Sequence, residues 1–210
     1  MIDQKKLISS IVEALLKEEK NISVNMVLGV SNRHIHLSQS DVEILFGKGY
    51  TLSMAKPLLQ PGQYATNETL IVAGPKGAIT KVRILGPVRS TTQVELLVSD
   101  GYTLGIKLPV RESGCKLPSP SVTLIGPKGS VILNTGVLAA SRHVHMSKED
   151  AVNLDLHDGD NVKIKINGDR SVIFDNVKVR TGEFVPEVHI DVDEANAAGV
   201  STGDQVEIII

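Results

Sequence analysis

Hydrophobic and polar positions follow two different periods along the chain. Over residues 3–20, apolar side chains recur every three or four residues with charged side chains between them, which predicts an amphipathic helix. From Met26 onward the apolar runs are short, rich in β-branched residues and separated by Gly and Pro. Residues 162–166 alternate strictly between apolar and charged side chains. The pattern predicts a mainly β protein with a few short helices.

One motif occurs twice in the chain. Residues 33–41 read Arg-His-Ile-His-Leu-Ser-Gln-Ser-Asp, and residues 142–150 read Arg-His-Val-His-Met-Ser-Lys-Glu-Asp. Its two copies begin 109 residues apart, at positions 33 and 142. We interpret the repeat as a sign of two related halves, each carrying one copy of the same site.

The repeated motif has the chemistry of a metal site. Side chains alternate along a strand, so two pairs of imidazoles converge: His34 with His36, and His143 with His145. A Ser-x-x-Asp spacing follows each pair and predicts that a helix starts there. Converging neutral imidazoles suit Zn²⁺. The alternative is a duplicated fold that kept surface histidines.

Each histidine pair needs a third ligand, because catalytic zinc usually takes three protein ligands and leaves one position open. His189 ends a short predicted strand and is the leading candidate, with Glu187 as a competing ligand or a supporting partner. Glu95 lies in an otherwise apolar strand, where metal coordination or exposure to solvent would each remove the cost of burying its charge. Cys115 could ligate zinc as thiolate, although a lone loop cysteine is more often inert.

Several arginines surround these candidates. Arg89 and Arg111 each follow a Pro-Val turn, and Arg33 and Arg142 flank the histidine pairs. A guanidinium suits bidentate contact with phosphate, to which Ser hydroxyls and Gly amides can add donors. For each arginine, a surface salt bridge is the alternative.

Composition excludes several classes of protein. With 22 Lys+Arg against 24 Asp+Glu and 3% aromatic residues, the chain has little basis for binding nucleic acid. No apolar run approaches the roughly 20 residues that span a bilayer, and the first residues lack a secretory cleavage site, so we expect no membrane association. A single Cys excludes a disulfide framework and fits the cytoplasm.

Taken together, the motifs resemble the PduL-type phosphotransacylases, also called phosphate propanoyltransferases. The resemblance extends from about residue 24 to residue 210 and rests on six segments: residues 31–37, 56–63, 86–95, 109–114, 142–146 and 187–199. This family interconverts acyl-CoA plus phosphate with acyl phosphate plus CoA, using two zinc ions. The resemblance therefore implies short-chain acyl-CoA (propanoyl-CoA or acetyl-CoA) and phosphate as substrates.

The resemblance also implies roles for individual residues and an architecture. One zinc would be held by His34, His36 and Glu95, and the other by His143, His145 and His189. Arg89 would contact phosphate, and Ser113 matches an active-site position. The fold would be two intertwined β-barrels, one built from residues 23–33 and 140–210 and the other from residues 34–139. Cys115 departs from the acidic or polar residue expected there.

The N-terminal residues 1–22 resemble an encapsulation peptide. Residues 3–20 would bind shell or cargo proteins and place the enzyme in the lumen of a bacterial microcompartment, such as one for propanediol degradation. The alternative is a helix that packs on the barrel or on the partner of a homodimer, which the family suggests. Two rival functions use the same ligands: a dinuclear zinc thioesterase or other hydrolase, and a non-catalytic module stabilised by metal.

Overall fold

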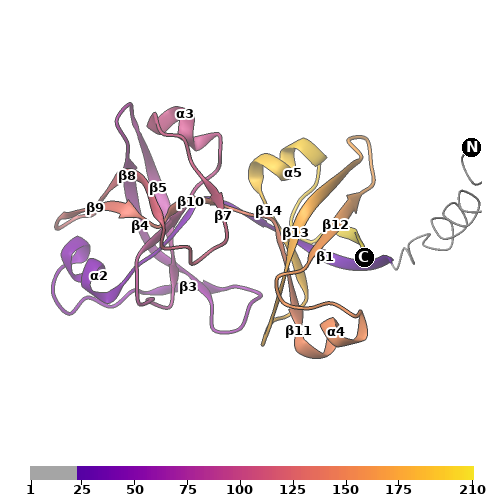
Figure 1. Ribbon diagram of the computed structural model, residues 1–210. Coiled ribbons are helices and arrows are strands. Elements are labelled where there is room, and N and C mark those ends of the chain that lie inside the picture. Colours follow the sequence, from indigo (N-terminus) through magenta and orange to yellow (C-terminus); the bar gives the residue numbers. More distant parts are fainter. Residues whose placement is uncertain (1–22) are drawn as a thin grey trace, which may run out of the picture.

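The protein is mainly β, with a few short helices, and this part of the prediction is confirmed. The computed structural model describes residues 23–210, which form strands β1 to β15 and helices α2 to α5. The predicted helix over residues 3–20 lies outside the described residues. Figure 1 shows two β-rich halves side by side. None of the helices described has both the length and the apolar character of a membrane span.

The last third of the chain closes a six-stranded barrel with the first strand. The strand order around it is β1-β14-β11-β13-β12-β15. Its strands are β1 (Ser23–Ser31), β11 (His143–Ser147), β12 (Asn161–Ile166), β13 (Val172–Gly182), β14 (Glu187–Asp191) and β15 (Gln205–Ile209). Two helices accompany them, α4 (Lys148–Asn153) and α5 (Val192–Ala198). Because β1 pairs with both β14 and β15, the two halves are intertwined rather than consecutive.

The middle of the chain builds a nine-stranded sheet. Its order is β7-β10-β6-β2-β5-β4-β8-β9, with β3 paired to β4. The strands are β2 (His34–His36), β3 (Met54–Pro57), β4 (Tyr64–Ala73), β5 (Ala78–Gly86), β6 (Gln93–Glu95), β7 (Val110–Arg111), β8 (Pro118–Ile125), β9 (Ser130–Thr135) and β10 (Val137–Ala140). Helices α2 (Gln39–Phe46) and α3 (Asp100–Leu104) belong to this half.

Each half has its own hydrophobic core, and these cores orient the histidines. Val144 and Met146 on β11 are fully buried in the core of the barrel, and Ile35 on β2 is fully buried in the core of the sheet. Burying such a side chain stabilises the fold by roughly 1.5–3 kcal/mol. Since neighbours along a strand point to opposite faces, the histidines on β2 and β11 face away from the cores.

Both predicted helix starts are confirmed. The Ser38 hydroxyl accepts a hydrogen bond from the Asp41 amide at 3.2 Å, and the Ser147 hydroxyl accepts one from the Asp150 amide at 3.0 Å. These contacts cap α2 and α4. In both copies of the repeated motif, the helix therefore begins at the same position after the histidine-bearing strand.

Candidate active site

His34, His36 and Glu95, here named the carboxylate cluster, meet on two paired strands. Strands β2 and β6 run antiparallel, with His34 opposite Glu95. The three residues offer ligand atoms that all lie within 4.8 Å of one another. His34 Nε2 is 3.5 Å from a carboxylate oxygen of Glu95. Two imidazoles and one carboxylate at this spacing can hold a divalent metal ion.

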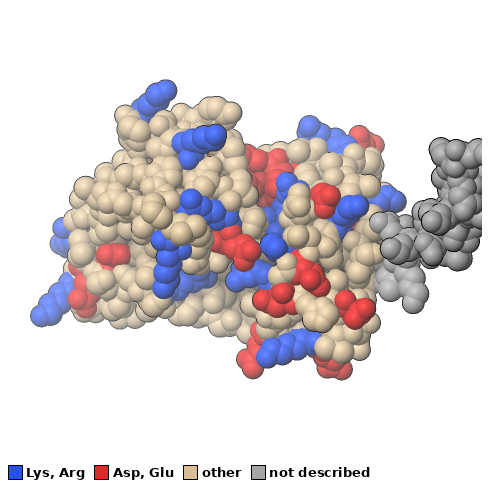
Figure 2. Space-filling view, in the orientation of Figure 1, with Lys and Arg blue, Asp and Glu red and all other residues tan. Residues whose placement is uncertain are grey.

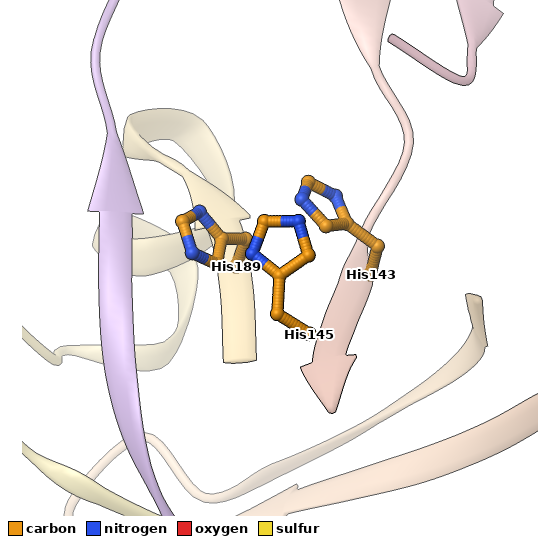
Figure 3. A group of neighbouring side chains, drawn as sticks. All are labelled: His143, His145 and His189. Carbon is orange, nitrogen blue, oxygen red and sulfur yellow. The ribbon is translucent and has the colours of Figure 1, made fainter. Parts of the chain in front are cut away.

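His143, His145 and His189, here named the imidazole cluster, meet in the other half. Strands β11 and β14 run antiparallel, with His143 opposite His189. Figure 3 shows the three rings gathered close together. Their centroids are 4.7–4.9 Å apart, and their ligand atoms lie within 4.8 Å of one another. The Phe184 ring stacks on the His145 ring, with 4.2 Å between their centroids, and covers one face of that imidazole.

The hydrogen bonds of the first histidine in each pair leave one nitrogen available for metal. His34 Nδ1 lies 2.8 Å from the Asn32 carbonyl oxygen, and His143 Nδ1 lies 3.0 Å from the Ser141 carbonyl oxygen. A carbonyl only accepts, so Nδ1 carries the proton and Nε2 keeps its lone pair. This arrangement is typical of metal-binding histidines.

The second histidine in each pair holds an unpartnered buried atom. Within residues 23–210, His36 Nδ1 and His145 Nδ1 are among the few buried side-chain atoms without a hydrogen-bond partner. Such an atom costs about 1–3 kcal/mol when it stays unpaired. A coordinated ion would give each ring a polar partner, so the donor sets and their surroundings fit Zn²⁺.

The buried histidines are neutral at pH 7. Burial, reinforced by the charge of neighbouring histidines, lowers the pKa of His36 to about 3 and the pKa of His145 to about 2. Burial and the nearby His189 lower the pKa of His143 to about 4. Because only the neutral imidazole binds metal, protons compete weakly with a metal ion near neutral pH.

Glu95 is a buried carboxylate, not a residue of a solvent-facing strand. Its exposed fraction is 8%. Burial alone would raise the pKa of Glu95, but the neighbouring His34 ring and the hydrogen bond from Ser113 bring that pKa below its ordinary value. Ser113 Oγ and Gln93 Nε2 each donate to Glu95 Oε1 at 2.6 Å. Ser113 therefore lies beside the carboxylate cluster and holds one of its ligands.

Both clusters open on one cavity of about 600 Å³ between the two halves. All six clustered residues line it, together with Arg89 and Ser113. It is also lined by four further basic side chains: Arg33, Lys56, Arg83 and Arg180. In Figure 2, Lys, Arg, Asp and Glu side chains gather where the halves meet. Five Lys and Arg side chains line the cavity against three carboxylates (Glu95, Glu183 and Glu187), and this excess of positive charge favours an anionic substrate.

Arg89 sits at the edge of the carboxylate cluster. Its backbone amide donates to the Leu37 carbonyl at 2.8 Å, which ties its loop to the end of β2. Burial lowers the pKa of Arg89, the charge of Glu95 raises it, and the charge of Arg180 lowers it further. A guanidinium nevertheless keeps its proton in proteins, so Arg89 presents a positive charge to the cavity.

Other sequence candidates lie in structural contacts. Arg33 forms an ion pair with Asp100 at 2.9 Å, and Arg142 pairs with Glu194. Arg111 donates to backbone carbonyl oxygens at 3.0 and 3.2 Å. Cys115 belongs to neither cluster. Arg33 and Arg142 therefore form salt bridges, the alternative to phosphate binding that the sequence left open.

Sequence reasoning missed several residues of this site, and Arg180 and Gln60 show why. Arg180 lies on β13 opposite His145, in a strand that carries no motif. Gln60 reaches from the loop after β3 and donates to Glu187 Oε2 at 2.9 Å. Its segment, residues 56–63, was part of the family resemblance, but nothing in its spacing pointed to a contact 127 residues away.

The fold and site define a mainly β protein with two related clusters of candidate metal ligands on one cationic cavity. Residues 27–201 match the family described as phosphate propanoyltransferase. A phosphate propanoyltransferase of Thermotoga maritima is 50% identical over 94% of this chain and 93% of its own. Another, of Rhodobacter capsulatus, is 50% identical over 86% of this chain and 85% of its own. A third, of Lachnoclostridium phytofermentans, is 44% identical over 99% of both chains. The chain belongs to the phosphate propanoyltransferase family.

A solved structure covers a shorter stretch of the chain. The crystal structure of the computationally designed msDPBB_sym2 protein is 32% identical and covers 31% of this chain and 76% of its own, with a TM-score of 0.24.

Proposed function

We propose that this protein interconverts short-chain acyl-CoA plus phosphate with acyl phosphate plus CoA at a dinuclear zinc site. The observation that supports the proposal most strongly is that two three-ligand clusters and Arg89 line the same cavity. Three ligands leave a position open for substrate, which a structural zinc site with four ligands would not. The family to which the chain belongs supplies the reaction class.

In the proposed reaction, a phosphate oxygen forms a bond to the acyl carbon and the carbon–sulfur bond breaks. The electron pair leaves with sulfur, so CoA departs as thiolate and acyl phosphate remains. Zinc held by the two clusters would offset negative charge on the substrate oxygens and on the departing thiolate. No covalent acyl-enzyme is needed, because phosphate itself is the nucleophile.

Residues of the chain supply binding and orientation. Arg89 would bind phosphate, reduce its repulsion from the developing oxyanion and orient one oxygen for attack. Ser113 Oγ, which donates to Glu95 at 2.6 Å, would keep that carboxylate in place. The cationic lining of the cavity would hold anionic substrates close to both clusters.

The test measures thiol release from propanoyl-CoA by zinc-loaded protein, with and without phosphate. We expect release to depend on phosphate and to yield acyl phosphate, because the cavity presents Arg89 beside the metal ligands. Equal release without phosphate would mean that water is the nucleophile and that the protein is a zinc thioesterase. No release with any short-chain acyl-CoA would favour a non-catalytic module.

We further propose that residues 3–20 bind shell or cargo proteins of a microcompartment, so that the enzyme works in its lumen. The apolar stripe in the sequence of this segment supports the proposal. Deleting residues 1–20 is expected to leave specific activity unchanged, because all clustered residues lie beyond position 33. Co-purification with shells should be lost. Unaltered co-purification would contradict the targeting role.

A further inference from the structure

The two clusters are built on the same three-strand pattern. In each half, the strand with two histidines pairs in parallel with one neighbour (β5 for β2, β13 for β11) and antiparallel with the other (β6 for β2, β14 for β11). The antiparallel register matches as well, because the third ligand lies opposite the first histidine in both halves: Glu95 opposite His34, and His189 opposite His143.

This equivalence extends to one residue outside each cluster. The residue two positions before the third ligand lies opposite the second histidine: Gln93 opposite His36, and Glu187 opposite His145. Gln93 and Glu187 are therefore corresponding positions on corresponding strands. Both are buried, with exposed fractions of 5% and 6%.

Each of these residues binds the third ligand that follows it, with opposite polarity. Gln93 Nε2 donates to Glu95 Oε1 at 2.6 Å. Glu187 Oε2 lies 2.7 Å from His189 Nε2 and accepts its proton. An amide donor thus faces the carboxylate ligand, and a carboxylate acceptor faces the imidazole ligand. With its Nε2 proton directed to Glu187, His189 keeps the lone pair on Nδ1 for a metal ion.

Further contacts hold Gln93 in one orientation. The Gly114 amide donates to Gln93 Oε1 at 2.6 Å. Gln93 Nε2 also donates to Ser113 Oγ at 3.0 Å. With its carbonyl oxygen and its amide nitrogen both engaged, the Gln93 side chain cannot rotate without losing hydrogen bonds.

Glu187 is held by a residue from the other half. Gln60 Nε2 donates to Glu187 Oε2 at 2.9 Å and to the Val185 carbonyl at 3.0 Å. The Val185 amide donates back to Gln60 Oε1 at 3.2 Å. The Glu187 carboxylate lies against Gly29, where a Cβ atom would clash with Glu187 Oε1. Glu187 is thus fixed toward His189.

We propose that Gln93 and Glu187 are equivalent positioning residues, each orienting the third metal ligand of its own cluster. The inference rests on the proposed function, in which both clusters hold zinc. Glu187 then supports His189 and is not itself a ligand. In the carboxylate cluster, the negative charge belongs to a ligand, Glu95. In the imidazole cluster, the negative charge belongs to Glu187, which hydrogen-bonds the ligand His189.

The test measures zinc affinity of the full chain by competition with a chromophoric chelator. We expect Glu187→Leu to weaken one of the two zinc sites about 10- to 100-fold, the usual cost of losing an orienting partner. Gln93→Leu should weaken the other site by a similar factor. Glu187→Gln should have a smaller effect, because its amide oxygen can still accept from His189. The matched control is Glu183→Gln, since Glu183 lines the same cavity but is exposed.

Co²⁺ absorption separates positioning from ligation. The Glu187→Gln variant loaded with Co²⁺ should keep the visible spectrum of the wild type. The spectrum of His189→Ala, which lacks a ligand, shows what a changed site looks like. A similar change in Glu187→Gln would make Glu187 a ligand and overturn the inference. Unchanged zinc affinity in folded Glu187→Leu and Gln93→Leu would also overturn it; if either leucine variant does not fold, unchanged affinity in Glu187→Gln and Gln93→Met decides. Failure of the wild type to bind zinc would instead overturn the proposed function.

Discussion

Replacing His145 with alanine is expected to lower kcat for phosphate-dependent thiol release by about a thousandfold or more. His145 is buried, and its ring lies within 4.8 Å of the other two rings of the imidazole cluster. Losing it leaves two ligands, too few for tight zinc binding. Metal-based stabilisation of charge contributes several kcal/mol, and about 4 kcal/mol corresponds to a thousandfold in rate. Steady-state kinetics together with the zinc content of the purified variant would check the result.

The control for this variant is His157→Ala. The His157 side chain is 82% exposed and belongs to neither cluster, so this variant should retain two zinc ions and full activity. A His145→Ala protein that loses one zinc but keeps its rate would show that the imidazole cluster has no part in catalysis.

Replacing Arg89 with alanine is expected to lower kcat/KM for phosphate by about 100- to 1,000-fold, the usual cost of removing one hydrogen-bond donor that stabilises developing negative charge. The KM for acyl-CoA should change much less, because the zinc ligands remain. Arg89→Lys should recover only part of the loss, since an ammonium keeps the charge but not the bidentate geometry. Varying phosphate at saturating acyl-CoA measures the effect.

Arg170→Ala is the matched control for Arg89→Ala. Arg170 is exposed in a loop of the barrel and does not line the cavity, so its loss removes one positive charge without touching the site. Phosphate kinetics that are the same in Arg89→Ala and the wild type would contradict the role of Arg89.

Local features of this chain were readable from the sequence because they depend on residues close together. The alternation within His-x-His places two imidazoles on one face whatever the strand pairs with. The capping serines at positions 38 and 147 act within three residues of their own chain. The many short runs rich in β-branched residues likewise predicted a mainly β fold, and the structure confirms it.

The third ligands were harder to derive from the residues alone. The first histidines of the two clusters, His34 and His143, are 109 residues apart, but Glu95 and His189 are only 94 apart. A search for a single repeat of 109 residues therefore does not align Glu95 with His189. The two residues also differ in chemistry, one a carboxylate and the other an imidazole. The residues alone left Glu95 open between metal coordination and exposure to solvent, and the family resemblance favoured coordination. The structure then shows that Glu95 is buried and paired opposite His34.

The sequence by itself determined which side chains share a strand face, where two helices begin and that the fold is mainly β. Tertiary structure alone decided which strands became neighbours and in what register, because that choice depends on packing two separate cores from residues far apart in the chain. The register set Gln93 and Glu187 in equivalent places, brought Arg180 beside His145, and carried Gln60 across to Glu187. No local pattern encodes these contacts, since each one joins segments that only the assembled cores bring together.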